Sequence, residues 1–223
     1  MLHTCLAPSA EDPVTVVSEY LETAGIIRSF LATSEVAKYW DFPSALEDWT
    51  VAGLSGHLAR PVLNMPAILA AEVPTDRPLV SAVDYYFTMP VSDLQRESTM
   101  AIEIRDRGIA SAGTGTKDLL TRFDTALAEL QQTLPTLAAD HEIVGLGTRM
   151  LLTEYLITRM VEMLVHADDL AVSIGRVCPV FPPAVSDSVI ATLACISARR
   201  NSPIDVIRAL AREERPIQRL SAF

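Results

Sequence analysis

Apolar side chains recur every three to four residues in four long segments of this chain, and this helical periodicity is the strongest constraint on its fold. The segments span about residues 13–33, 50–60, 116–134 and 148–174. Their predicted caps are Asp12–Pro13 for the first segment, Thr50 and Thr116 for the next two, and Gly175 just after the last. No strand pattern is strong, although residues 141–144 can form a short strand. The sequence therefore predicts an all-α protein built on an antiparallel helical bundle.

Weaker helical signals lie between and behind these four segments. A further helix is predicted over residues 92–107. Pro61 and Pro66 are expected to kink or break the second segment, because proline lacks a backbone N–H donor and clashes with the preceding turn. Shorter helices are predicted over residues 183–199 and 203–212, the second of them after a Ser–Pro start.

A proline-rich linker, C-P-V-F-P-P, divides the chain into two parts. We expect a bundle over residues 10–175 and a small C-terminal helical extension over residues 176–223. The apolar stretch from Val185 to Ile196 in this extension can serve an interface as well as a core, so a homodimer is one expectation.

The charge of the chain bears on its partners. It has 18 Lys and Arg against 28 Asp and Glu, which gives a net charge of −10 and a pI of about 4.8. Binding to nucleic acid needs clustered Lys and Arg, so nucleic acid is not an expected partner. No segment approaches the roughly 18 uninterrupted apolar residues that a membrane span requires, so no membrane partner is expected either. A small-molecule substrate fits this balance better.

The N-terminus and the cysteines predict a cytoplasmic protein. The first residues, M-L-H-T-C-L-A-P, lack the basic region and long apolar core of a signal peptide. Cys5, Cys178 and Cys195 form an odd and scattered set, which fits reduced cysteines in the cytoplasm better than a disulfide framework.

A carboxylate and an imidazole interrupt the apolar stripe of the fourth long segment, in M-V-E-M-L-V-H-A-D-D-L. Glu162 and His166 are four residues apart, so both project from the same side of a helix and can chelate one metal ion. Among the four histidines, His57 in the second segment is the best candidate for a third, inward-facing ligand. Two histidines and one glutamate leave at least one coordination position open, as in catalytic sites.

Other interpretations of these residues stay open at this level. A Glu–His pair at this spacing can be an ordinary helix ion pair, and a histidine beside leucine can be a core residue with satisfied hydrogen bonds. The same three ligands also suit non-haem iron, so the ligands alone do not identify the metal. Asp168 and Asp169 are normally a solvated helix end, although either can instead fix a histidine tautomer.

Two stretches of the sequence resemble one known family. They are W-T-V-A-G-L-S-G-H-L-A at 49–59 and E-Y-L-I-T-R-M-V-E-M-L-V-H-A-D-D-L-A at 154–171. Together they resemble the mycothiol-dependent maleylpyruvate isomerase family of the DinB-like superfamily. The resemblance covers roughly residues 10–175 and implies a DinB-like antiparallel four-helix bundle with a small helical part behind it.

The resemblance also implies a metal site and a cosubstrate. The family's ligands, a histidine in the second helix and a glutamate and a histidine in the fourth, match His57, Glu162 and His166. Zinc is the metal that it implies, with nickel and iron as alternatives. Relatives use a low-molecular-weight thiol, mycothiol or bacillithiol, so the resemblance implies a thiol-dependent cis–trans isomerase or an S-transferase.

Two further residues are candidates for a role in that chemistry. Arg159 precedes Glu162 by three residues, which suits either a helix salt bridge with Glu162 or an anchor for substrate or thiol. Asp169 is the second candidate, as a partner of a histidine ligand. Other arginines that can meet an anionic substrate are Arg60, Arg77, Arg96, Arg105 and Arg107.

Two other functions fit the same residues. The protein can be a metal-dependent enzyme without a thiol cosubstrate, in which a metal-bound water acts as base or nucleophile. It can also be a non-catalytic member that binds a ligand or a partner protein. An open coordination position at the end of a pocket favours an enzyme, and a fully ligated, closed site favours a structural role.

Overall fold

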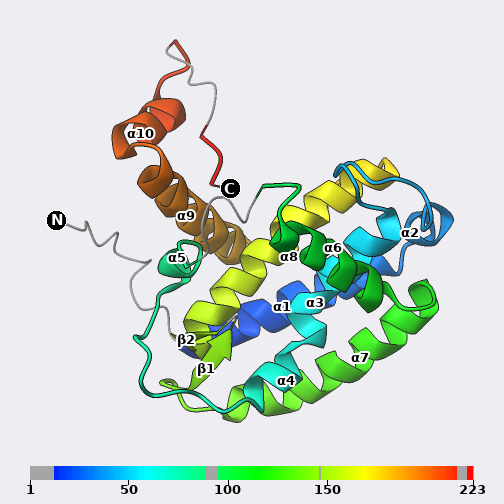
Figure 1. Ribbon diagram of the computed structural model, residues 1–223, viewed down its shortest axis with the longest axis horizontal. Coiled ribbons are helices and arrows are strands. Elements are labelled where there is room, and N and C mark those ends of the chain that lie inside the picture. The colour runs from blue at the N-terminus through cyan, green and yellow to red at the C-terminus, as the bar shows by residue number, and fades with distance from the viewer. Residues whose placement is uncertain (1–12, 89–94, 146, 215–219, 223) are drawn as a thin grey trace.

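The computed structural model describes residues 13–88, 95–145, 147–214 and 220–222 of the chain (Figure 1). Its centre is a bundle of four helices, in which α1 and α3 each contact α7 and α8. These helices are α1 (Pro13–Leu31), α3 (Val51–Leu63), α7 (Thr116–Thr133) and α8 (Leu152–Ile174). The predicted all-α architecture is therefore confirmed.

The core of the bundle is formed by the apolar stripes that the periodicity predicted. Each stripe is buried because residues three and four apart lie on one side of a helix. Large side chains that are fully buried include Tyr20, Ile27, Leu54, Leu58, Phe123 and Leu130. The hydroxyl of Tyr20 donates to the backbone oxygen of Pro61 at 2.9 Å, so its polar atom is satisfied inside the core.

Two of the predicted caps are confirmed. The hydroxyl of Thr50 accepts a hydrogen bond from the backbone N–H of Gly53 at the start of α3. Gly175 ends α8 in a left-handed conformation, with φ 67° and ψ 36°. The N–H groups of Arg176 and Gly175 donate to the carbonyls of Ala171 and Val172, which is the Schellman arrangement.

Of the other two predicted caps, one is wrong and one cannot be compared with the structure. Thr116 is the first residue of α7 rather than its cap, because Gly115 occupies the cap position with a φ of 147° that favours glycine. The predicted cap Asp12 lies outside the described residues.

The fourth helix begins later than predicted, at Leu152 instead of 148. Residues Thr148–Leu151 form strand β2, which pairs antiparallel with β1 (Glu142–Gly145). Ile143 and Met150 face each other in this hairpin and are buried, so the ladder competes successfully with the helix. The prediction of a short strand over 141–144 is confirmed to within one residue.

The predicted helix over residues 92–107 is displaced along the chain. Residues 89–94 lie outside the described part, and α6 (Thr99–Ala112) begins after Ser98, whose hydroxyl accepts from the N–H of Ala101 at 3.0 Å. The helix continues through Gly108 to Ala112. At Gly108 the absence of a side chain lets α6 approach α3 closely. A Cβ added to Gly56 of α3 would lie 2.1 Å from the backbone oxygen of Gly108.

The second segment is broken into two helices, as the two prolines predicted, but the break lies between Leu63 and Met65 and not at Pro61. Helix α3 runs through Pro61 to Leu63, and the short α4 (Met65–Leu69) follows with Pro66 in its first turn. Three other short elements complete the part before the tail: α2 (Ser34–Lys38), α5 (Ala82–Tyr85) and the 3-10 helix η2 (Leu134–Thr136).

The C-terminal helices are α9 (Pro183–Arg200) and α10 (Pro203–Ala211), close to their predicted bounds. Helix α9 packs against α8 and α5. Its last two residues hold the α5 segment: Arg199 pairs with Asp84, and Arg200 donates to the backbone oxygen of Tyr86 at 3.0 Å.

Two other predictions concern the cysteines and the membrane. Cys195 is disulfide-bonded and Cys178 is free, so the prediction of reduced cysteines is wrong for Cys195.

Among the described residues, no helix combines the length and the apolar character that crossing a bilayer requires.

Candidate metal centre

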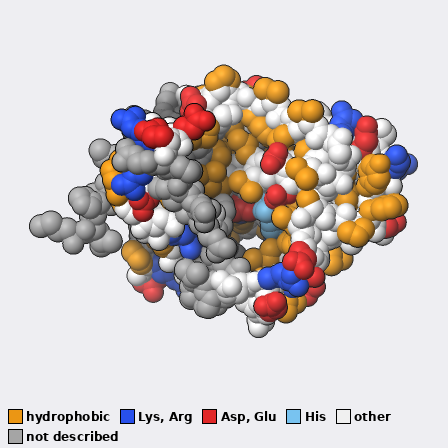
Figure 2. Space-filling view, turned by 90° about the horizontal axis from the view of Figure 1, so that it is seen from above, with side chains coloured by type: hydrophobic (Ala, Val, Ile, Leu, Met, Phe, Trp, Pro, Cys, Tyr) orange, Lys and Arg blue, Asp and Glu red, His pale blue; other side chains and the backbone are white. Residues whose placement is uncertain are grey.

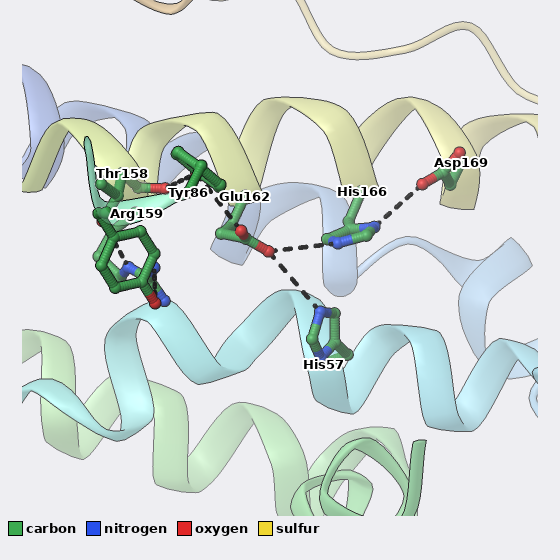
Figure 3. Close-up of polar contacts among 8 residues, drawn as sticks. His57, Tyr86, Thr158, Arg159, Glu162, His166 and Asp169 are labelled. Atoms are coloured by element: carbon green, nitrogen blue, oxygen red, sulfur yellow. Dashed lines mark hydrogen bonds and ion pairs between the residues drawn. The ribbon is translucent and has the colours of Figure 1, made fainter. Parts of the chain in front are cut away.

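His57, Glu162 and His166 come together between two helices of the bundle (Figure 3). His57 projects from α3, and Glu162 and His166 project from successive turns of α8. The Nε2 atoms of His57 and His166 lie 3.8 Å and 3.4 Å from the same oxygen, Oε2 of Glu162. The side chains are 16%, 25% and 19% exposed in sequence order, so the cluster is largely shielded but open to solvent on one side.

The spacing of these three atoms suits a metal ion better than mutual hydrogen bonds. One ligand atom from each residue lies within 4.8 Å of the others. Ligands about 2.0–2.1 Å from a tetrahedral ion are separated by about 3.3 Å, close to both nitrogen–oxygen distances here. The cluster can therefore bind a metal ion through two nitrogens and one oxygen.

Asp169 fixes the orientation of His166. Its Oδ2 lies 3.0 Å from Nδ1 of His166, which leaves Nε2 directed at the cluster. Burial lowers the pKa of His166, but the hydrogen bond to Asp169 and the contact with the Glu162 carboxylate outweigh it and raise that pKa to about 9. Asp168 is exposed and takes no part in the cluster. The two aspartates therefore have different environments, and Asp169, the one that the sequence analysis singled out, is the one that contacts His166.

His57 has a different environment from His166. Burial is the main cause that lowers the pKa of His57, so its imidazole is neutral at pH 7, the form that binds a metal ion. Within the described residues its Nδ1 atom is buried without a hydrogen-bond partner. The ring is held by packing instead: the rings of Trp49 and His166 meet it edge-on, at centroid distances of 5.1 and 4.6 Å.

Glu162 is held as a carboxylate. Burial raises its pKa, but contacts with His166 and His57, together with the nearby Arg159, lower it well below its usual range. Tyr86 donates to Oε1 of Glu162 at 3.4 Å, and burial raises the pKa of this phenol, so it keeps its proton. Oε1 is thus engaged by Tyr86, while Oε2 faces the two histidines.

Arg159 lies one turn before Glu162 and does not form the helix salt bridge that its spacing allowed; within the described residues no ion pair joins them. Its guanidinium donates instead to Thr158 Oγ1 at 3.1 Å and to the hydroxyl of Tyr85 at 3.2 Å. It also lies over the rings of Tyr85 and Tyr155, at 5.5 and 4.6 Å from their centroids. Arg159, which has no ion pair with any carboxylate in the described part of the chain, is thus held beside the cluster.

Several residues around the cluster were not identified from the sequence. Trp49 immediately precedes the cap of α3, and Tyr85 and Tyr86 lie on or beside the four-residue helix α5. The available signal was Ser81, whose hydroxyl accepts from the N–H of Asp84 and so marks the start of this helix. A helix this short has too few residues to show a periodicity.

Of the remaining two histidines, only His141 lies among the described residues, and it is not part of the cluster. His141 lies before β1 and its backbone oxygen accepts from Leu152, and His3 lies outside the described residues. In the space-filling view of Figure 2, a histidine is visible inside a hollow bordered by apolar and acidic side chains.

Comparison with known proteins identifies one family. The family described as the mycothiol maleylpyruvate isomerase N-terminal domain matches residues 23–171, which include both stretches that carry the resemblance and all three residues of the cluster. No curated protein and no solved structure matches the chain.

Proposed function

Because the chain belongs to the family of the mycothiol maleylpyruvate isomerase N-terminal domain, we propose that it is a zinc-dependent enzyme that uses a low-molecular-weight thiol. In this proposal His57, Glu162 and His166 bind the metal ion, and mycothiol or a similar thiol attacks an activated small electrophile. The product is a cis–trans isomer or a thioether.

One observation carries the proposal: two imidazole nitrogens from different helices point at one oxygen of Glu162. A metal-free ion pair between His166 and Glu162 explains one of these contacts, but it does not explain why the neutral ring of His57 is directed at the same oxygen. Two nitrogens and one carboxylate oxygen form a donor set typical of catalytic zinc, with room for a further ligand.

The charges around the cluster favour an anionic ligand there. Metal binding requires both imidazoles to be neutral, so the three residues then carry −1 and a bound divalent ion makes the site +1. Arg159 adds another positive charge. A divalent ion with an open position lets a thiol lose its proton near neutral pH. Arg159 binds negative charge on the thiol or the electrophile, because its guanidinium has no carboxylate partner among the described residues.

The proposed reaction needs no oxidant or reductant. The thiolate sulfur adds to an activated cis double bond, whose electron pair moves into the activating group. The former double bond is then single and rotates. Expulsion of the thiolate restores the double bond in the trans geometry and returns the thiol. In an S-transferase, the adduct instead takes up a proton and leaves as product.

Thiol consumption distinguishes these two outcomes. Purified protein is incubated with mycothiol and an activated cis-alkene, and product and free thiol are measured together by NMR and thiol titration. An isomerase returns all of the thiol, whereas a transferase consumes one thiol for each product molecule. Mycothiol should also raise the melting temperature of the zinc-loaded protein, because it binds the folded state.

A matched pair of variants makes the test specific to the cluster. Glu162→Gln should abolish both the turnover and the stabilisation by mycothiol, while Asp168→Asn on the same helix should keep both. If wild-type protein shows neither mycothiol-dependent turnover nor stabilisation, a thiol is not its cosubstrate. Turnover of the electrophile without thiol would indicate metal-dependent chemistry through water instead.

We expect Asp169→Asn to weaken zinc binding by about 10- to 100-fold, the usual effect of removing the partner of a histidine ligand. The amide keeps the shape of the side chain but removes the charge that orients Nδ1 of His166. Competition with a chromophoric chelator measures the affinity. Equal affinities of Asp169→Asn and wild type would show that this contact does not support the metal site.

Zinc affinity should also rise with pH. In the metal-free protein the pKa of His166 is about 9, so its ring is protonated at pH 7 and must lose that proton to bind zinc. The pKa of His57 is lowered, so this ring releases none. The affinity should rise by about tenfold per pH unit from pH 7 and level off near pH 9. Chelator competition at each pH, corrected for the chelator's own protonation, measures the affinity. A zinc affinity that stays constant between pH 7 and pH 9 would contradict this prediction.

A further inference from the structure

A polar pocket is lined by residues of α3, α6 and α7. These three helices pack against one another (Figure 1). The volume of the pocket is about 520 Å³. One arginine from each helix lines it: Arg60 from α3, Arg107 from α6 and Arg122 from α7. Three guanidinium groups around one pocket are notable in a chain with a net charge of −10.

Arg60 is the central group of this pocket. Its Nη1 donates to the hydroxyl of Ser111 at 3.2 Å, and no described carboxylate lies within ion-pair distance of it. The side chain is partly buried, and burial, followed by the charge of Arg107, lowers its pKa. Desolvation makes an uncompensated charge costly. A guanidinium in this position therefore favours the binding of an anion that supplies the missing negative charge.

The other two arginines have weak partners. Arg107 lies 3.5 Å from Glu103, and Arg122 lies 3.3 Å from Asp118, each one turn away on its own helix. Both pairs are exposed, and such pairs contribute little to stability, so they can be rearranged at small cost. Glu129 is the one carboxylate among the described residues that line the pocket.

The lining also offers uncharged hydrogen-bonding groups. Arg122 donates to the backbone oxygen of Ser111 at 2.8 Å, which ties the ends of α6 and α7 together. The side chains of Asn64 and Ser111 contribute an amide and a hydroxyl, whereas the hydroxyl of Thr125 donates to the backbone oxygen of Thr121. Forked guanidinium donors beside hydroxyls form the donor set that binds the oxygens of a phosphate group.

We propose that this pocket binds a phosphate group, either as free phosphate or as the ester of a small metabolite. The pocket is larger than one phosphate ion needs, which leaves room for the rest of an ester. This pocket shares no residue with the histidine cluster, although Arg60 lies one turn after His57 on α3 and its charge lowers the pKa of His57. The proposal rests on the arginines of the pocket and not on the proposed enzymatic function.

Calorimetric titration of the full chain at constant ionic strength tests the proposal. The probes are inorganic phosphate, glucose 6-phosphate and, as the ligand without phosphate, glucose. We expect saturable binding of at least one phosphate-containing probe and none of glucose. Tighter binding of the ester than of inorganic phosphate would identify an ester as the ligand, and the reverse would identify free phosphate.

Variants locate the binding. Arg60→Gln should raise the dissociation constant by at least about tenfold, as expected for a lost charge-assisted contact. Arg107→Gln should weaken binding in the same direction and covers the case in which Arg60→Gln does not fold. Arg212→Gln, which removes an exposed arginine at the end of α10, should leave binding unchanged.

Phosphate can also bind a metal ion, so the titrations are repeated with Glu162→Gln. Binding that persists in Glu162→Gln and weakens in Arg60→Gln supports the arginine pocket. Binding that is lost in Glu162→Gln but unchanged in Arg60→Gln and Arg107→Gln would place the phosphate at the histidine cluster and overturn the proposal. Equal weakening by Arg60→Gln and Arg212→Gln would also overturn it, because that indicates general charge attraction.

Discussion

Glu162→Gln is expected to reduce zinc affinity by roughly a hundredfold or more, because losing the partner of a ligand already costs 10- to 100-fold and Glu162 is itself a proposed ligand. The amide has nearly the same shape as the carboxylate, but it removes the negative charge at which both histidines point. The purified variant should contain almost no metal by elemental analysis. Chelator competition gives the change in affinity.

Asp168→Asn is the matched control for this change. Asp168 is an exposed carboxylate on the same helix, six residues further along, so its replacement removes the same charge away from the cluster. Metal content should stay at the wild-type level in this control. If Glu162→Gln, His57→Ala and His166→Ala all retained wild-type metal content, these three residues would not be the ligands.

Gly56→Ala is expected to destabilise the fold by about 3 kcal/mol or more, which is at the upper end of the cost of overpacking a core. The added Cβ would lie 2.1 Å from the oxygen of Gly108 and 2.4 Å from the nitrogen of Ala112. Both are backbone atoms of α6, so the contact can be relieved only by separating two helices. Urea unfolding monitored by circular dichroism measures the change.

Gly25→Ala gives the opposite expectation at a comparable site. Gly25 also lies within a helix, but an added Cβ meets nothing within 4 Å there. Alanine at this position should therefore stabilise the protein by about 0.5–1 kcal/mol, the usual advantage of alanine over glycine inside a helix. If Gly56→Ala and Gly25→Ala had equal stability, the backbones of α3 and α6 would not lie as close together as described.

The bundle was predictable because four amphipathic stripes extend over several turns each. Periodicity fails for shorter elements: strand β2 occupies four residues that also continue the helical stripe of α8, and only its pairing with β1 makes it a strand. The start of α6 was misplaced for a related reason, since its apolar residues are only roughly periodic. Its course is determined by the contact of Gly56 with Gly108, a tertiary feature without a local signal.

The candidate site shows the same division. Spacing alone placed Glu162 and His166 on one side of a helix, and the choice of His57 came from elimination among four histidines. Helical geometry also accounts for the difference between the aspartates: a residue three after His166 lies near it on the helix surface, whereas a residue two after it does not. The contact of Tyr86 with Glu162 could not be predicted, because the two residues are far apart in the sequence and no local pattern links them.

The attachment of α9 to α5 has a consequence for how such a site can change in evolution. Arg199 and Arg200 hold the segment that carries Tyr85 and Tyr86, and these tyrosines contact Arg159 and Glu162. Both arginines lie beyond residue 171, where the family match ends. Substitutions in the tail can therefore alter the surroundings of the cluster while every bundle residue stays the same, so two chains with the same three cluster residues can differ in the environment that their C-terminal helices give that cluster.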